Sequence, residues 1–283
     1  MPTLLELVGT NGESMNEKAV SEADIKAWRE DGVVCLRQLF SADWMQTLES
    51  GFEQSVANPG ELSKDYADPG QGSFFTDHAM FQRIDPIRRF VFDGPAAEIA
   101  ARLMGAAKVN LIDDHLLVKE PGTANPTYWH QDQPYFQFAG EQFCSIWIAI
   151  DAANEANGTL RFVPGSHQWG KEYQPVRIGL GDSPDAVEVF DGPAPDVDAA
   201  PEKYETRSWN LAPGDCLAFH GKMLHGAFPN ASHDARRRAI SLRFAGDDIR
   251  WQPRSYAPTE TDLSGFKAGD VIDSDQFPAI WRA

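Results

Sequence analysis

The spacing of apolar residues changes near residue 105 of this chain. Before that point they recur every three or four positions, the period of a helix with one buried side. A helix is expected to begin at Ser21 and to end at Gly32, and a second begins at Ser41, each opened by a residue that can cap it. The apolar run Val33–Leu36 between them is read as a buried strand.

Residues 57–76 are rich in Gly, Pro, Asp and Ser, which predicts a loop, and a helical stretch follows around 85–104. Beyond Gly105 the apolar residues form short runs separated by turns. The runs expected to be strands are 108–112, 115–119, 143–150, 159–163, 216–219 and 238–244. Many short strands after a helical opening indicate a mainly β protein with flanking helices, in which helices pack outside an antiparallel barrel or jelly roll.

Three segments depart from this pattern. Residues 1–20 lack clear periodicity and are expected to form a partly ordered arm. Residues 170–208 are acidic and rich in Pro and Gly, so a lid or insert loop is expected, with disorder as the equal alternative. The aromatic-rich tail 247–283 is expected to pack on the core. With no internal repeat and no linker, 1–283 is interpreted as a single domain.

Charge and cysteine usage narrow the class of protein. The chain of 283 residues has 25 basic and 42 acidic side chains, a formal net charge of −17. Because phosphate groups bind basic surfaces, neither a nucleic acid nor an anionic membrane is expected as a partner. Cys35, Cys144 and Cys216 are an odd number without metal-site spacing, and no apolar run reaches the length of a bilayer. A reducing, cytoplasmic setting is expected.

One short stretch concentrates side chains that bind metals. Among the seven histidines, His130 alone begins a His-x-Asp or His-x-Glu triplet, completed by Asp132. In an extended segment residues i and i+2 share a face, so the imidazole and the carboxylate lie side by side. They are two thirds of the 2-His-1-carboxylate triad that holds non-haem Fe(II) and leaves coordination positions open. The alternative is a surface turn, since Pro134 follows closely.

The third ligand must come from elsewhere in the chain. His225 is the candidate, because Gly226 lets the backbone bend close to a ligand. Taken alone, a histidine beside a glycine is more often structural. His220, also followed by a glycine, is the rival distal ligand.

A basic strand after His225 supplies another kind of group. Arg237, Ala239, Ser241 and Arg243 share one face, and the other face is mainly apolar and is expected to pack outward. Inside a barrel, a guanidinium can bind a carboxylate through two parallel hydrogen bonds. An iron enzyme that uses a 2-oxo acid needs such a clamp for the carboxylate far from the metal. Arg237 and Arg243 both lie on this face and could serve as the clamp, with a substrate contact as the alternative role of Arg243.

The chain resembles the phytanoyl-CoA dioxygenase family of Fe(II)/2-oxoglutarate oxygenases in the order and spacing of its motifs. The likeness runs from about Ser21 to the end of the chain. The motifs are His130-x-Asp132, Pro164-Gly165-Ser166-His167, Gly214-Asp215, His225-Gly226 and Arg237-x-Ala239-Ile240-Ser241. The resemblance implies a double-stranded β-helix, a cupin-like jelly roll, in which the iron ligands are His130, Asp132 and His225.

The resemblance also implies a cosubstrate site. Arg237 would anchor the far carboxylate of 2-oxoglutarate, with Lys119 and Trp147 nearby. Ala227 departs from the family, whose members often carry a hydroxyl residue there. Ser241 or a water is expected to supply the missing hydrogen bond.

The implied reaction is the hydroxylation of an aliphatic C–H bond of a small-molecule substrate. It uses Fe(II), 2-oxoglutarate and O2 and releases succinate and CO2. Asp132 favours hydroxylation over halogenation, because related halogenases replace this carboxylate to make room for a halide. The expected substrate contacts are Tyr128, Gln133, Tyr135 and Arg243. The alternatives are a non-oxidative cupin-like metalloenzyme and a catalytically degenerate binding protein, and the chain is expected to be a monomer or a homodimer.

Overall fold

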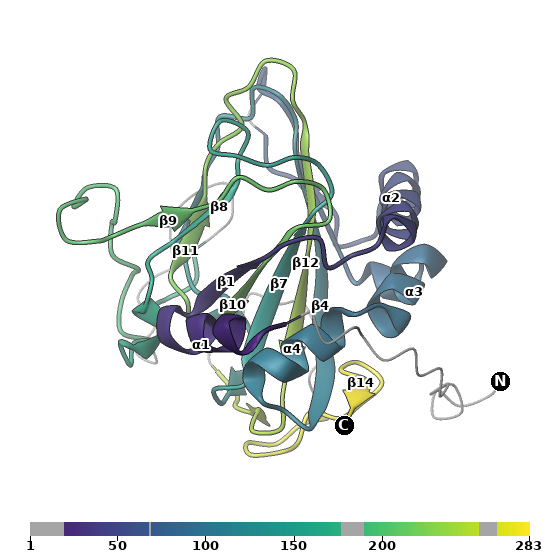
Figure 1. Cartoon of the computed structure of the whole chain (residues 1–283), viewed down its shortest axis with the longest axis vertical. Coiled ribbons are helices and arrows are strands. Elements are labelled where there is room, and N and C mark those ends of the chain that lie inside the picture. The colour runs from purple at the N-terminus through teal and green to yellow at the C-terminus, as the bar shows by residue number, and fades with distance from the viewer. Residues whose placement is uncertain (1–19, 68, 177–189, 255–264) are drawn as a thin grey trace.

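Two antiparallel sheets make up most of the molecule (Figure 1). The computed structural model describes residues 20–67, 69–176, 190–254 and 265–283. The large sheet contains, in order, β1 (Val33–Leu36), β10 (Cys216–His220), β7 (Phe143–Ala149), β12 (Arg237–Ala245), β4 (Lys108–Lys119), β3 (Phe74–His78) and β2 (Lys64–Asp65), with β14 (Ala279–Arg282) beside β4. The small sheet contains β5 (Thr127–His130), β11 (His225–Ala227), β8 (Leu160–Phe162) and β9 (Arg207–Ser208), while β6 (Phe138–Ala139) pairs with β13 (Arg250–Trp251).

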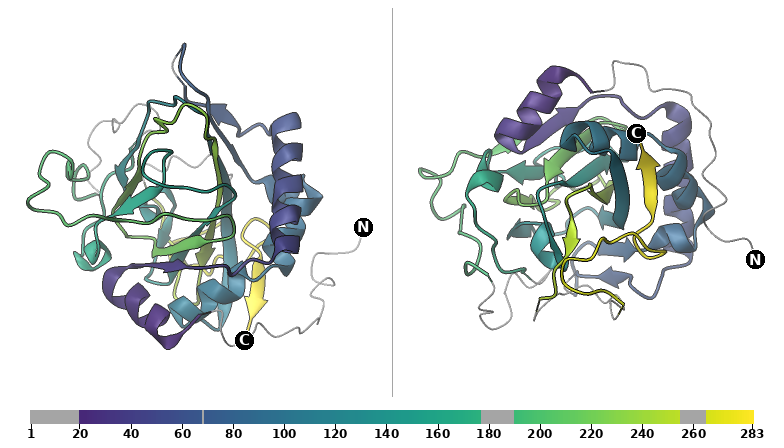
Figure 2. Two further views of the ribbon diagram at one scale, coloured as in Figure 1. Left: turned by 45° about the horizontal axis from the view of Figure 1, so that its top comes forward. Right: turned by 90° about the horizontal axis from the view of Figure 1, so that it is seen from below.

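The inner faces of the two sheets pack against each other, and helices cover the outer face of the large sheet (Figures 1 and 2). Inside, Trp147 of β7 shares a hydrophobic cluster with Phe162 of β8. On the outer face, Ile240 and Leu242 of β12 belong to one cluster with the helices α1 (Glu22–Asp31), α2 (Ala42–Ala57), α3 (Asp85–Asp93) and α4 (Ala96–Met104). The mainly β jelly roll with flanking helices is confirmed, as is the outward packing of the apolar face of β12.

The first two helices begin where the sequence predicts. Ser21 and Asp24 form a reciprocal capping box at α1, and Gly32 ends this helix at φ 78°, a left-handed conformation that glycine adopts without a Cβ clash. The Ser41 side chain caps α2 by accepting the Trp44 amide. Local capping chemistry therefore sets both helix starts.

The predicted helical stretch 85–104 is in fact two helices. α3 ends at Asp93 and α4 begins at Ala96, with Gly94 and Pro95 between them. Proline has no N–H for an intrahelical bond and its ring clashes with the preceding turn, so one helix cannot continue through it.

Conversely, the two strands predicted at 108–112 and 115–119 are one continuous strand, β4. The prediction of a break at the polar pair Asp113 and Asp114 was wrong, because tertiary contacts satisfy both carboxylates. Asp114 accepts the amides of Met80 and Phe81, at the start of the short helix η2 (Met80–Gln82). The loop predicted at 57–76 is also broken, by β2 and the start of β3.

The long segment 170–208 is described in two parts. Residues 170–176 and 190–206 form irregular structure that leads into β9, and Tyr173 and Val197 pack near Trp129. Its residues 177–189 lie outside the described ones, as do residues 1–19 of the predicted arm. The short helices η3 (Gln133–Tyr135) and η4 (Ser166–Gln168) complete the element order.

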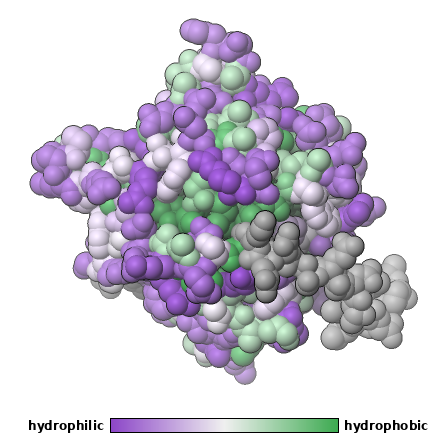
Figure 3. Space-filling model, viewed as in Figure 1, coloured by the Kyte–Doolittle hydropathy of each residue, from purple (hydrophilic) through white to green (hydrophobic). Residues whose placement is uncertain are grey.

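The described part of the tail lies against the sheets. Trp251 and Phe277 share a hydrophobic cluster with Phe138 and Phe143, and β14 extends the large sheet beside β4. The face seen in Figure 3 is mainly hydrophilic, with apolar residues gathered near its centre. Cys35, Cys144 and Cys216 are free thiols. Within the described ranges, no helix combines the length and apolarity needed to cross a membrane.

Candidate metal and cosubstrate site

Three side chains meet between the sheets, two from neighbouring strands and one from just beyond a strand end. The expected extended segment ends at His130, because β5 stops there, and Asp132 has helical backbone angles (φ −74°, ψ −44°) at the start of η3. His225 of β11 pairs directly with His130 of β5, and Asp132 follows two residues later. Asp132 Oδ1 lies 3.6 Å from His130 Nε2 and 3.8 Å from His225 Nε2. The two imidazole centroids are 4.2 Å apart. The structure thus brings together two ring nitrogens and one carboxylate oxygen within reach of a single ion.

The other ring nitrogen of each histidine determines its tautomer. His130 Nδ1 lies 2.8 Å from the Tyr128 carbonyl oxygen, and His225 Nδ1 lies 2.9 Å from that of Met223. A carbonyl only accepts, so each Nδ1 carries the hydrogen and each Nε2 keeps its lone pair. Burial, together with the nearby His130, lowers the pKa of His225 to about 3, so this imidazole is neutral. Both rings are therefore oriented as metal-binding histidines are, with Nε2 toward Asp132.

The carboxylate is held ionised by its neighbours. Asp132 accepts the Ser145 hydroxyl at 2.6 Å and the Arg243 guanidinium at 3.0 and 3.2 Å. Burial by itself raises the pKa of Asp132, but the charge of the Arg243 guanidinium holds it well below its usual range. An anion beside two lone pairs is a donor set suited to a divalent cation.

Arg237 lies further along the same interior, on β12. Its side chain is buried, and Nη1 donates to the Leu117 carbonyl at 3.0 Å. Among the described residues its Nε has no hydrogen-bond partner, and no acidic side chain forms an ion pair with it. Burial lowers the pKa of Arg237 to about 10. A buried guanidinium without a counter-charge costs free energy unless an anion binds there, so this position suits a carboxylate of 2-oxoglutarate.

Lys119 pairs with Arg237 across β4 and β12, but its ammonium is already satisfied. Lys119 Nζ donates to the carbonyls of Phe228 at 2.9 Å and Asn125 at 3.1 Å and lies over the Phe74 ring. Lys119 is not among the residues of the cavity wall described next, and its contact with the cosubstrate stays a prediction.

A cavity of about 450 Å³ joins these groups. Its wall includes the three metal-binding candidates, Arg237, and Trp147 and Ser241, which face each other on β7 and β12. Ala227 also lines it, so the position that departs from the family pattern faces the same space as Ser241.

The predicted substrate contacts separate into two groups. Tyr135 lines the cavity and exchanges hydrogen bonds with the backbone of Val176. Arg243 lines it too, but its guanidinium is bound to Asp132 and, at 2.7 Å, to Asp113. Tyr128 is exposed and Gln133 is buried with its amide on the Gly140 carbonyl, and neither lines the cavity.

The structure places His220, the rival third ligand, outside the cavity, and Gly226 against the neighbouring strand β5. His220 does not line the cavity; its Nδ1 accepts the Lys222 amide and its Nε2 lies 3.7 Å from Glu141. Gly226 allows a close backbone contact. A Cβ there would lie 2.7 Å from the Thr127 carbonyl oxygen, so the glycine lets β5 approach β11.

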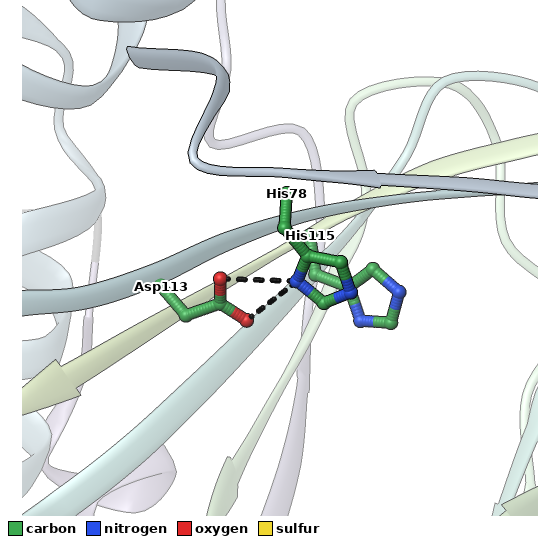
Figure 4. Close-up of side chains that lie close together, drawn as sticks. All are labelled: His78, Asp113 and His115. Carbon is green, nitrogen blue, oxygen red and sulfur yellow. Dashed lines mark hydrogen bonds and ion pairs between the residues drawn. The ribbon is translucent and has the colours of Figure 1, made fainter. Parts of the chain in front are cut away.

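A second group of side chains in the cavity was not predicted. His78, Asp113 and His115 line it from β3 and β4 (Figure 4). His115 shares the strand face of Lys119, four residues away, which is the one sequence signal that could have indicated it. His78 and Asp113 carry no comparable signal, because strand pairing alone brings them together.

Comparison with known proteins agrees with this architecture. The family model described as phytanoyl-CoA dioxygenase (PhyH) matches residues 28–239. A probable phytanoyl-CoA dioxygenase of Caenorhabditis elegans is 30% identical over 161 residues, 54% of this chain and 48% of that protein. The phytanoyl-CoA dioxygenase of Arabidopsis thaliana is 29% identical over 177 residues, 62% of this chain and 58% of that protein. The chain thus spans about half to three fifths of these relatives.

Solved structures show the same fold. The epimerase SnoN, in complex with Fe3+, alpha ketoglutarate and nogalamycin RO, superposes with a TM-score of 0.72 at 22% identity, covering 92% of this chain and 98% of that one. EctD from S. alaskensis, with 2-oxoglutarate and 5-hydroxyectoine, gives 0.65 at 19% identity, covering 89% and 87%. With the family match over most of its length, the chain belongs to the phytanoyl-CoA dioxygenase family.

Proposed function

We propose that the chain is an Fe(II)/2-oxoglutarate-dependent dioxygenase that hydroxylates an aliphatic C–H bond of a small molecule, with succinate and CO2 as co-products. One observation carries the proposal. A cavity contains both a convergent pair of imidazole Nε2 atoms with a carboxylate and, separately, the buried guanidinium of Arg237, whose Nε has no partner among the described residues. Metal-binding groups alone would suit many enzymes, but the added cation suits a dicarboxylic cosubstrate.

Each residue has a proposed task. His130, Asp132 and His225 hold the metal, and Arg237 holds the far carboxylate of 2-oxoglutarate. When bound, Fe(II) and 2-oxoglutarate supply the oxidising chemistry that uses O2. Ser145 and Arg243 keep Asp132 oriented and ionised, while Trp147 and Ser241 line the space between the two ends of the cosubstrate.

Hydroxylation is the outcome that the ligand set favours. Asp132 keeps the carboxylate that halogenases of this type lack. The neighbouring structures are described as an epimerase and a carbocyclase, so the fold itself is compatible with several outcomes. The apolar part of the cavity wall, which includes Phe81, Ile112 and Phe136, suits a substrate with an aliphatic portion near the metal.

The test follows metal and cosubstrate separately. Under anaerobic conditions, Fe(II) and 2-oxoglutarate added to the purified protein are expected to produce a visible charge-transfer band. Asp132→Ala and His225→Ala each remove a ligand and should weaken Fe(II) binding by more than roughly a hundredfold. His220→Ala, which removes a buried histidine outside the cavity, is the matched control and should keep the band.

The response to O2 and to 2-oxoglutarate then distinguishes the proposed dioxygenase from the two alternative classes of protein. On admission of O2 with a panel of small carboxylates, amino acids and acyl-CoAs, succinate release above the substrate-free rate is expected for at least one compound. A folded protein that binds metal but gives no band with 2-oxoglutarate would indicate the cupin-like metalloenzyme. A band with no succinate from any compound would indicate the binding protein.

A further inference from the structure

The cluster of His78, Asp113 and His115 faces the same cavity as the proposed iron site (Figure 4). One nitrogen or oxygen of each residue lies within 4.8 Å of the others, which is the spacing of a second metal site. The contacts argue for a different role. Figure 4 shows the Asp113 carboxylate bonded to His78, at 3.1 and 3.3 Å from Nδ1, with the His115 ring stacked behind.

The geometry of the rings disfavours a metal ion there. The rings of His78 and His115 stack with centroids 3.8 Å apart and planes 20° apart. A metal ion binds the in-plane lone pair of an imidazole, and the lone pairs of two stacked rings lie in nearly parallel planes and do not converge on one point. The Asp113 carboxylate already accepts from Arg243 at 2.7 Å.

Arg243 determines which nitrogen of His115 carries the hydrogen. Arg243 Nη1 lies 3.4 Å from His115 Nδ1, and a guanidinium only donates, so Nδ1 is the acceptor. Burial, reinforced by the charges of His78 and Arg243, lowers the pKa of His115 well below its usual value, which keeps the ring neutral. The single N–H is then on Nε2. The His115 side chain is 3% exposed, and Nε2 has no partner among the described residues.

Two buried N–H groups of the described cavity wall therefore lack acceptors, Arg237 Nε and His115 Nε2. The distance between these two side chains can be estimated along β4. Arg237 Nη1 reaches the carbonyl of Leu117, which lies two residues from His115 on β4. Two residues of strand span about 7 Å. This separation suits an acceptor at each end of a five-carbon dicarboxylic acid.

We infer that His115 Nε2–H donates a hydrogen bond to the C1 carboxylate of 2-oxoglutarate, the carboxylate next to the keto group, while Arg237 binds the opposite end. This inference rests on the proposed function and adds a cosubstrate contact to it. His78 and Asp113 are positioning residues. Asp113 holds both His78 and Arg243, and His78 supports the imidazole of His115 by stacking.

Two 2-oxo acids distinguish the two ends of the site. 2-Oxoglutarate has both carboxylates, and 2-oxovalerate replaces only the far one with a methyl group. Binding is measured anaerobically by titrating Fe(II)-loaded protein and following the absorption band. His115→Phe keeps a stacked ring but removes both nitrogens, and is expected to raise the Kd of both acids by the same factor, roughly tenfold or more. Arg237→Leu should raise the Kd of 2-oxoglutarate alone.

His115→Gln is the rescue variant, because its amide nitrogen can stand near the position of Nε2. It should bind both acids within a few-fold of the wild type. Wild-type affinity of His115→Phe for both acids would overturn the inference, and so would a loss confined to 2-oxoglutarate. A wild-type protein that binds neither acid would instead refute the proposed function, and the inference with it.

Discussion

The partner of Nδ1 decides whether Nε2 of a cavity histidine carries a lone pair or a hydrogen. In His130 and His225, Nδ1 donates to a backbone carbonyl, which leaves Nε2 as a lone-pair donor for a metal. In His115, Nδ1 accepts from Arg243, which makes Nε2 a hydrogen donor. Residue types and spacing indicated His130 and Asp132 as a metal-binding pair, and the family resemblance added His225. The tautomers depend on contacts between strands far apart in sequence.

The charge of the Arg243 side chain is expected to stabilise the folded protein. Its guanidinium compensates the buried carboxylate of Asp132 and the partly buried carboxylate of Asp113. Arg243→Met removes that charge and leaves both anions buried, so the free energy of unfolding of the metal-free protein should fall by about 3–5 kcal/mol, measured by urea denaturation.

The matched control is Arg207→Met, which breaks the ion pair with Asp31 at a site where both side chains are more than a third exposed. That change should cost at most about 1 kcal/mol, because solvent screens the pair. Equal losses for the two variants would contradict a compensating role for Arg243.

At the scale of elements, the pairing of β5 with β11 assembles the metal-binding groups. His225 lies opposite His130, and the ladder shifts register between His225 and Ala227. The strands can approach because Gly226 has no side chain, as a Cβ would lie 2.7 Å from the Thr127 carbonyl oxygen. A glycine after the distal histidine therefore has a packing reason.

Gly226→Ala should push the two strands apart. We expect a loss of about 1–3 kcal/mol in the free energy of unfolding, the usual result of overpacking, and several-fold weaker Fe(II) binding because His225 moves from His130. Gly265→Ala is the control, since its new methyl group meets no atom within 4 Å. Thermal unfolding and anaerobic Fe(II) titration measure both effects. Unchanged metal affinity in Gly226→Ala would show that the strand separation does not position His225.

At the scale of the whole molecule, the site lies between layers that are packed independently of it. One hydrophobic cluster joins the helices to the outer face of the large sheet, and another joins the two sheets. A third includes the described tail residues Ile249, Trp251 and Phe277. We propose that the chain folds as one domain, because these clusters share the strands of a single large sheet.

A single cooperative transition is expected when the metal-free protein unfolds, with far- and near-ultraviolet circular dichroism changing together. Fe(II) at a hundred times its Kd should stabilise the folded state by about 2.7 kcal/mol, since the ion binds only folded protein. Asp132→Ala should unfold cooperatively but show no Fe(II)-dependent shift. Two separate transitions in the wild type would contradict the single domain.

The sequence by itself determined the features that depend on neighbouring residues. Helix caps at Ser21 and Ser41, the alternating faces of β12 and the His130-x-Asp132 triplet all follow from local spacing and side-chain chemistry. The local pattern wrongly predicted a break at Asp113 and Asp114, because these polar residues continue the strand β4.

Tertiary structure alone decided which distant groups satisfy one another. It gave Asp113 and Asp114 their partners and tied Arg243 to Asp132. It also left one donor each of Arg237 and His115, in one cavity, without a partner among the described residues. The physical reason is that the cost of burying a charge or an N–H group depends on what lies across the interior. Local sequence does not specify those neighbours.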